Sequence, residues 1–295
     1  MNRQRLRHCP WRMAILSEIT LYPIKSCAGI ALREAVLTDC GLMSEHVYDR
    51  EWMVVDAEGR FLTQREYPRM ALIVPAIKAA TLALRAPGML PLEIELGLPH
   101  PQQAPMLEVS LWDEAVRAYD CDEVTATWFS NAIGTPCRLV RFHPDVVRTT
   151  GTSWTGGIAA PTLFSDGYPL LVASVASLGD VNEKLRTAGR AALPMNRFRP
   201  NLVLDGIGAF EEDYADALQF GATTLKPVKP CPRCPIPSVD QATGVPGPDP
   251  LDVMRAYRAK PELDGAICFG MNAIVTRGGD ERIVVGQEVG FDLAF

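Results

Sequence analysis

Two cysteines, Cys231 and Cys234, stand three positions apart in the stretch KPVKPCPRCPIPSVDQATG, which covers residues 226–244. Five prolines restrict the backbone of this stretch, and Arg233 stands between the two thiols. A Cys-x-x-Cys pair can bind a metal, exchange disulfides or present a single thiolate. The spacing alone therefore leaves several chemistries open.

A structural zinc site is the first possibility. Such a site usually needs four ligands, commonly two Cys-x-x-Cys pairs or one pair with two histidines. The sequence has only one such pair, and its four histidines, at positions 8, 46, 100 and 143, all lie far apart. A distant cysteine such as Cys268 could complete the set, but the number of ligands argues against zinc.

A thioredoxin-like dithiol is the second possibility, because Cys-x-x-Cys pairs often have lowered thiol pKa values. That motif normally opens a helix, whereas Pro235 and Pro237 remove backbone donors and exclude a regular helix here. A third possibility assigns a function to one thiolate, stabilised by Arg233, Lys229 and Lys226 and held rigidly by the prolines. Such a thiolate suits a soft or high-valent metal. Two buried cysteines without a chemical role are the remaining alternative.

Short strands dominate the sequence around this motif. Alternating apolar and polar residues over 14–26 predict a half-buried strand that ends in a loop at Pro23. Similar runs recur about every ten residues, which favours a barrel or sandwich over a parallel sheet with crossover helices. The other predicted strands lie in EAVLTDCGL, REWMVVDAEGRFLT, MALIVPAIK, ATLALRA, LEIEL, VRAYDC, RFRPNLVLDG, LQFGATTLKPVKP, AICFGMNAIVT and RIVVGQEVGFDLAF.

Helical patterns interrupt these strands at three places. Helical spacing predicts a helix near 122–134 that ends at Gly134, and a second helix over 175–186 that begins after a Ser174 N-cap. A third is predicted near 250–259. Between the first two, the Thr-, Gly- and Pro-rich residues 142–161 lack periodicity and predict a long loop. Its Trp154 is a candidate substrate wall, with a surface loop of no function as the alternative.

The composition is that of an ordinary globular protein, with 295 residues, 47% hydrophobic and 22% charged. The net charge of -6 provides no overall basic field, so we expect no nucleic-acid partner. Eight widely spread cysteines indicate a reducing compartment. No apolar run reaches about 18 residues, so no membrane-spanning helix is predicted. We therefore expect a cytoplasmic protein with no membrane partner.

Four stretches precede the cysteine motif CPRCPIPSVDQATG in a recognisable order: LYPIKSCAGI, GLMSEHVYDREWMVVDAEGRFLTQREYPRMALI, FSDGYPLLVAS and NRFRPNLVLDG. Together they resemble the MOSC family, and specifically its two-domain members, which include the amidoxime-reducing components of mitochondria and bacterial relatives. The resemblance implies a mainly β fold with some helices (α+β). It places a basic disordered tail at 1–12, an N-terminal MOSC β-barrel domain at 13–135 and a MOSC β-barrel domain at 136–295, with the boundary near the loop 142–161.

The resemblance also implies a molybdenum cofactor, in which a pterin dithiolene holds an oxo-molybdenum centre and a protein cysteine supplies a further sulfur. The second cysteine of the family's motif corresponds to Cys234, which would be the metal ligand and the catalytic residue. Cys231 would have no metal role. Residues that match the family's cofactor-binding positions are Lys25, Ser26, Arg50, Asp166, Arg199, Asn201 and Arg233.

These residue types suit such a ligand. Cations bind a dianionic phosphate, and an amide or carboxylate edge can pair with the donors and acceptors of a pterin ring. Any one of these residues alone is more commonly part of a structural ion pair. We expect Arg65 to lie in a second layer of side chains, behind those that contact the phosphate. Pro232 departs from the family pattern, because relatives carry a small hydroxyl residue there and proline removes a backbone donor.

The implied function is a molybdenum oxidoreductase that reduces small N-hydroxylated compounds, namely hydroxylamines, amidoximes or N-hydroxylated bases. The sequence contains no Cys-x4-Cys-x2-Cys pattern of a two-iron ferredoxin domain, which some bacterial relatives append. We therefore expect a separate electron-donor protein, such as a flavin reductase, a ferredoxin or a cytochrome-type protein. Alternatives are a cofactor-binding or carrier protein that transfers sulfur through Cys234 without turnover, and a zinc or thiol module without the cofactor.

Overall fold

The computed structural model describes residues 12–97 and 105–293. Strands predominate over helices in these residues, so the predicted mainly β fold with some helices is confirmed. Arg12 is the first residue of strand β1, and the rest of the predicted tail over 1–12 lies outside the described residues. No helix in the described ranges is both long and apolar enough to cross a membrane.

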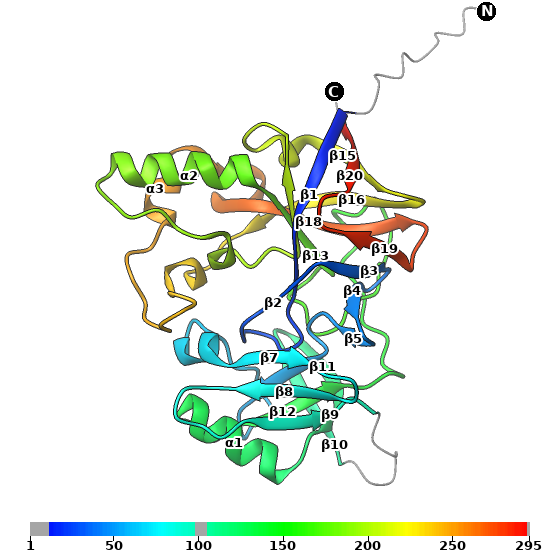
Figure 1. Ribbon diagram of the computed structural model, residues 1–295, viewed down its shortest axis with the longest axis vertical. Coiled ribbons are helices and arrows are strands. Elements are labelled where there is room, and N and C mark those ends of the chain that lie inside the picture. Colours follow the sequence, from blue (N-terminus) through cyan, green and yellow to red (C-terminus); the bar gives the residue numbers. More distant parts are fainter. Residues whose placement is uncertain (1–11, 98–104, 294–295) are drawn as a thin grey trace, which may run out of the picture.

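Seven strands of the described residues close into a barrel (Figure 1). Their order is β13, β14, β1, β20, β15, β16 and β18, and the pairing of β18 with β13 closes the ring. Only β13 and β14 run parallel within this ring. β2 and β17 add to β1 and β18. The bounds are Arg12–Leu21 (β1), Ile30–Leu32 (β2), Leu170–Ser174 (β13), Leu202–Asp205 (β14), Ala215–Phe220 (β15), Thr223–Pro232 (β16), Ala259–Lys260 (β17), Ala266–Arg277 (β18) and Glu288–Leu293 (β20).

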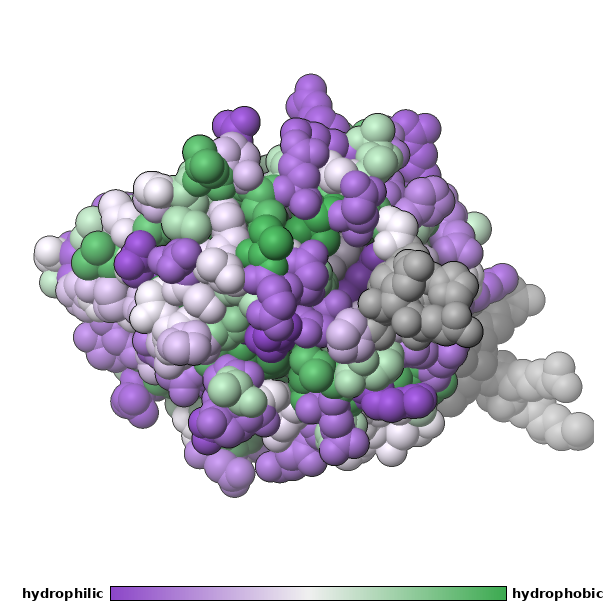
Figure 2. All heavy atoms as spheres, turned by 90° about the horizontal axis from the view of Figure 1, so that it is seen from below, coloured by the Kyte–Doolittle hydropathy of each residue, from purple (hydrophilic) through white to green (hydrophobic). Residues whose placement is uncertain are grey.

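Three smaller sheets complete the β structure. One orders β10, β11, β12 and β6; another orders β19, β3, β4 and β5; the third orders β7, β8 and β9. Figure 2 shows the molecule from below, where polar side chains surround small apolar groups. The bounds are Glu34–Thr38 (β3), Gly41–Ser44 (β4), Val47–Tyr48 (β5), Trp52–Val55 (β6), Val74–Ile77 (β7), Thr81–Arg85 (β8), Leu92–Glu95 (β9), Met106–Leu111 (β10), Glu114–Asp120 (β11), Arg138–Phe142 (β12) and Glu281–Val284 (β19).

The three predicted helices are present, and two of their ends lie at the predicted Gly134 and Ser174. Helix α1 (Glu123–Ile133) begins where the side chain of Asp122 accepts a hydrogen bond from the Thr125 amide, and it ends at Gly134 with φ 91. Helix α2 (Val175–Thr187) has Ser174 as its N-cap, as predicted. Helix α3 (Leu251–Arg258) confirms the third prediction. Short 3-10 helices are η1 (Pro68–Leu72), η2 (Met195–Arg197), η3 (Glu211–Tyr214), η4 (Ile236–Ser238) and η5 (Pro261–Leu263).

Strand pairing joins the two halves of the sequence. β1 lies between β14 and β20, and β3 pairs with β19, so strands from the first 40 residues pair directly with strands from the last 100 or so. The buried residues of β1 change from even to odd numbers at an irregularity between Leu16 and Glu18. The division of the sequence at residue 135 stays a prediction, because strand pairs cross it.

The strand that carries the cysteine motif, β16, faces a bulge in β18. β16 extends to Pro232, so Cys231 lies in a strand and only Cys234 follows it in a loop. Pro230 pairs with Met271 and Pro232 with Cys268, so two residues of β18, one of them Gly270, face Cys231 alone. Gly270 has φ +75 and passes close to the backbone of β13.

We predict that Gly270→Ala destabilises the protein more than Gly265→Ala. Both glycines have φ +75, but a Cβ at Gly270 would lie 2.7 Å from the Val172 carbonyl oxygen, whereas a Cβ at Gly265 meets nothing within 4 Å. The Gly265 variant should lose about 1–2 kcal/mol from backbone strain alone. Urea unfolding measures both losses. Equal losses of unfolding free energy in the two variants would show that the close approach of β18 to β13 does not contribute to stability.

Candidate functional site

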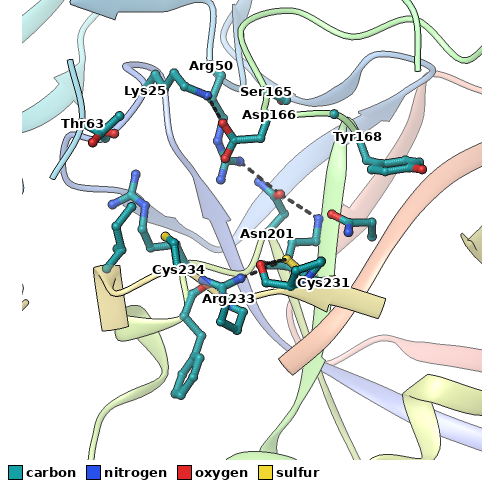
Figure 3. Close-up of a pocket in the computed structure, with 18 of the residues that line it drawn as sticks. Lys25, Arg50, Thr63, Ser165, Asp166, Tyr168, Asn201, Cys231, Arg233 and Cys234 are labelled. Carbon is teal, nitrogen blue, oxygen red and sulfur yellow. Dashed lines mark hydrogen bonds and ion pairs between the residues drawn. The ribbon is translucent and has the colours of Figure 1, made fainter. Parts of the chain in front are cut away.

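A pocket of about 580 Å³ is lined by residues from both halves of the sequence (Figure 3). All eight residues predicted from the family resemblance lie in its wall: Lys25, Ser26, Arg50, Asp166, Arg199, Asn201, Arg233 and Cys234. They come from the loop after β1, the turn before β6, the loop before β13, the segment between η2 and β14, and the loop after β16. The structure therefore gathers them, while their roles stay predictions.

The pocket wall is strongly cationic in a chain of net charge -6. It contains a single carboxylate, Asp166. The cationic side chains in the wall are Lys25, Arg50, Arg65, Arg199, Lys229 and Arg233. Like charges gathered in a concave site focus a positive potential, so this pocket favours an anionic ligand.

Arg199 is a buried cation of this wall that has no polar protein partner among the described residues. It is 7% exposed, and its guanidinium carbon lies 4.2 Å from the centre of the Tyr22 ring. Within residues 12–97 and 105–293, no hydrogen bond or ion pair is made by its side chain. Burial lowers the pKa of Arg199. A buried charge without a partner is costly, so this guanidinium is suited to bind an anion.

Arg50 is instead held by an internal network. It forms an ion pair with buried Asp49 and donates to the Asn201 Oδ1 at 3.2 Å. The amide of Asn201 also donates to the Thr20 carbonyl and to Asp49, and its Oδ1 accepts from the Leu171 amide. All polar atoms of Asn201 thus have protein partners. This favours a role for Asn201 in positioning Arg50 over direct contact with a ligand.

Lys25 and Asp166 form a pair close to Arg50 (Figure 3). The Lys25 Nζ donates to Asp166 Oδ1 at 2.6 Å and to the Phe164 carbonyl at 2.9 Å, and burial lowers the pKa of Lys25. Surrounding protein atoms raise the pKa of Asp166, but the Lys25 charge and hydrogen bonds from Lys25 and Trp112 outweigh this and lower it to about 2. Asp166 is therefore a carboxylate under ordinary conditions.

Backbone strain is concentrated around the pocket. Four lining residues other than glycine have left-handed backbone angles: Ser26 (φ 65), Arg50 (φ 52), Trp112 (φ 55) and Arg199 (φ 55). Each such residue costs about 1–3 kcal/mol, and such residues cluster at functional sites. The strain turns three predicted site residues into the pocket, a feature that the sequence patterns did not reveal.

The two cysteines have different surroundings. Arg233 lies between them in Figure 3, donating from Nη1 to the Cys231 Sγ at 3.1 Å and from Nη2 to the Phe198 carbonyl at 2.9 Å. Its Nε is buried and has no protein partner. The Cys234 thiol is free and makes no hydrogen bond within the described residues. This arrangement leaves Cys234, and not Cys231, available to a ligand.

The alternatives drawn from the cysteine motif fare unequally. No group of three or more His, Cys, Asp or Glu side chains that could hold a metal occurs in the described residues. Lys229 lines the pocket as expected, with its Nζ 5.6 Å from the Trp154 ring centre. Lys226, however, lies outside the lining, 3.9 Å from Asp216, so its predicted contribution to the thiolate is wrong. Trp154, the predicted substrate wall, is not among the lining residues but contacts the lining residue Lys229.

Several lining residues were not predicted. Arg65 was placed behind the phosphate contacts, yet it lies in the wall, with its guanidinium 4.9 Å from the Trp112 ring centre. The motif TQREYP was a usable signal for Arg65. The other unpredicted polar or aromatic lining residues are Thr63, Trp112, Ser165, Tyr168, Phe198 and Asn272.

Comparison with known proteins agrees with these motifs. Residues 13–136 match the MOSC N-terminal beta barrel domain, and residues 160–290 match the MOSC domain. Mitochondrial amidoxime reducing component 2 of Rattus norvegicus is 33% identical over 292 residues, which are 95% of this chain and 85% of that protein. The chain belongs to the MOSC family.

Two further relatives of this MOSC protein carry informative names. Mitochondrial amidoxime-reducing component 1 of Mus musculus is 33% identical over 97% of this chain and 86% of its own length. Molybdenum cofactor sulfurase of Bos taurus is 31% identical over 79% of this chain, but only 27% of that longer protein is covered. Two of these relatives are thus named for amidoxime reduction and one for the molybdenum cofactor.

A reciprocal amide pair connects two motifs of the MOSC protein. Gln64, fully buried, donates to Gln241 at 3.3 Å and accepts from it at 2.9 Å. Gln64 also donates to the Ser26 carbonyl at 2.7 Å. Gln241 follows the cysteine loop, which Arg197 holds through the Ser238 carbonyl at 2.9 Å. The pair therefore ties the loop of Cys234 to the strained turn at Ser26.

We predict that Gln64→Leu and Gln241→Leu are coupled in their effects on stability. Each should cost about 1–3 kcal/mol, because each leaves buried polar atoms unsatisfied. The double variant should cost less than the sum, with a coupling of about 0.5–3 kcal/mol. Urea unfolding of the four proteins in the cycle measures this term. Additive losses would mean that the amide pair holds nothing together.

We predict that Asp166→Asn weakens the pH dependence of stability in acid. The pKa of Asp166 is about 2 in the folded protein, below the ordinary value of 3.8, so its charge stabilises the fold above the ordinary value. That contribution fades as the pH falls toward about 2. The difference in unfolding free energy between wild type and variant should therefore shrink as the solution is acidified. Lys25→Met removes the cause of the lowered pKa, so the difference in unfolding free energy between wild type and this variant should also shrink as the solution is acidified. A difference that stays constant with pH would contradict the assignment.

Proposed function

We propose that this MOSC protein binds a molybdenum cofactor in the cationic pocket and reduces small N-hydroxylated compounds, namely hydroxylamines, amidoximes or N-hydroxylated bases. The observation that carries the proposal is Arg199, a buried guanidinium without a protein acceptor among the described residues, in the same pocket as a free cysteine thiol. The printed names of the relatives point the same way.

The residues present fit such a group. A pterin phosphate requires cations, and the wall offers six against one carboxylate. A soft metal centre prefers a thiolate, and the Cys234 thiol is free of hydrogen bonds to the described residues. The pocket volume of about 580 Å³ lies in the range of about 300–1,000 Å³ common for cofactor sites. The buried Nε of Arg233 is a further donor without a partner.

The side chains divide the work by their contacts. Arg199 and Lys25 would bind the anionic part of the cofactor, and Asn201 and Asp49 hold Arg50 in place for the same purpose. Cys234 would ligate the metal, while Arg233 keeps the Cys231 sulfur engaged. When bound, the cofactor supplies a metal that passes two electrons to an N–O bond. With two protons, the bond breaks to give the amine or amidine and water.

The electrons would come from a separate donor protein, such as a flavin reductase, ferredoxin or cytochrome-type protein. A cytoplasmic location without membrane or nucleic-acid partners is also part of the proposal, although the amidoxime-reducing relatives are named as mitochondrial. Transfer of sulfur or of the cofactor, without turnover, is a second candidate. It is favoured by the likeness to the Bos taurus molybdenum cofactor sulfurase, and Cys234 would then carry a persulfide.

We predict that Cys234→Ala abolishes reduction of N-hydroxylated compounds, whereas Cys231→Ala retains a measurable rate. Protein purified with its cofactor is supplied with reduced viologen dye and benzamidoxime, and dye oxidation is followed. Molybdenum and pterin contents are measured in parallel, and Arg199→Gln should lower both because it removes the unpaired cation. Turnover no faster than in Cys234→Ala would leave the carrier function as the better account. Molybdenum retained in Cys234→Ala but lost in Cys231→Ala would reverse the ligand assignment.

A further inference from the structure

Trp112 stands at the tip of the hairpin formed by β10 and β11. Leu111 pairs with Glu114, so Trp112 and Asp113 alone form the turn. Trp112 is 47% exposed, lines the pocket and has φ 55. A two-residue hairpin turn with positive φ at its first position normally carries glycine, asparagine or aspartate there. A tryptophan in this place costs about 1–2 kcal/mol of backbone strain.

The contacts of Trp112 fix its side chain without burying it. The indole Nε1 donates to Asp166 Oδ1 at 3.1 Å. The Arg65 guanidinium lies 4.9 Å from the Trp112 ring centre, and the Phe61 ring packs edge-on at 5.0 Å between centres. A tryptophan kept only for packing would be buried. This one is strained, oriented by three neighbours and still about half exposed at the pocket wall, which is how a binding surface is built.

The chemistry around Trp112 suits a planar ligand. An indole ring binds other aromatic rings by offset or edge contacts, which contribute about 0.5–1.5 kcal/mol beyond the buried area. Beside it, the Asp166 side chain is 73% exposed, and its Oδ2 accepts no hydrogen bond from the described residues. That oxygen can accept an N–H. A planar ring that carries an N–H edge therefore fits this part of the wall better than a small aliphatic compound.

We propose that Trp112 is a specificity-determining residue, whose indole ring selects planar aromatic N-hydroxylated substrates over small aliphatic ones. This inference rests on the proposed function. Arg65 and Phe61 act through Trp112, because they hold the indole in its orientation. The strain at the hairpin tip is retained because the side chain, and not the turn, is needed at this position.

The test compares Trp112→Gly, Trp112→Phe and Asp113→Gly. Glycine is the residue that the turn itself prefers, so Trp112→Gly removes the ring while keeping or raising Tm. Its KM for benzamidoxime should rise about tenfold, with little change in kcat, while its KM for N-methylhydroxylamine stays unchanged. Trp112→Phe should recover most of the difference. Asp113→Gly alters the same turn but keeps the ring, so both KM values should match the wild type.

Equal changes of KM for both compounds in Trp112→Gly would overturn the proposal, because they would indicate a general disturbance of the pocket. If the cofactor-loaded wild type reduces neither compound, the proposed function fails. The role of Trp112 is then tested separately, by measuring how tightly benzamidoxime binds. Calorimetric titration with benzamidoxime should then show about tenfold weaker binding to Trp112→Gly than to wild type. Equal affinities, or no binding to wild type, would overturn the role of Trp112.

Discussion

The pocket depends on how the end of β1 is fixed against the start of β14. Asn201 makes this junction: its backbone carbonyl accepts from the Thr20 amide at 2.8 Å, and its side chain donates back to the Thr20 carbonyl at 3.2 Å. The chain beyond Thr20 then delivers Lys25 and Ser26 to the pocket, while the chain before Asn201 delivers Arg199. A pairing between strands about 180 residues apart in sequence therefore sets the positions of the cations.

Without an anion, this arrangement is electrostatically unfavourable. Burial lowers the pKa of both Lys25 and Arg199, which means that each charged form is less stable in the protein than in water. Left-handed backbone at Ser26, Arg50 and Arg199 adds strain at the same place. The barrel and its cores must supply the stability that these residues consume. An anionic ligand would reverse the electrostatic part, so ligand binding and folding stability should be linked.

The sequence predicted those features of the fold that depend on neighbouring residues, such as the ends of helices. The N-cap Ser174 and the C-terminal Gly134 were predicted because capping depends on neighbouring residues alone. The described strands β2, β5, β10, β12, β13 and β17 lie in none of the predicted strands. In β12, Arg138 and Arg141 break the alternation, and only the fold shows that Arg141 is buried against Glu51 at 2.7 Å. Trp112 was missed for a similar reason, because its hairpin tip lacks the glycine or asparagine that marks a turn.

The site residues were predicted from several motifs that occur in a recognisable order. The structure adds the different surroundings of Cys231 and Cys234, which that order does not show. The two cysteines look equivalent in the sequence, but the ladder of β16 and β18 separates them. Cys231 lies opposite the bulge of β18 that contains Gly270, and the Arg233 amide donates to the Ile267 carbonyl at 2.8 Å. This fixes Arg233 so that its guanidinium meets the Cys231 sulfur. Cys234 comes one residue after the last ladder bond, so its sulfur is the one that the backbone geometry leaves free.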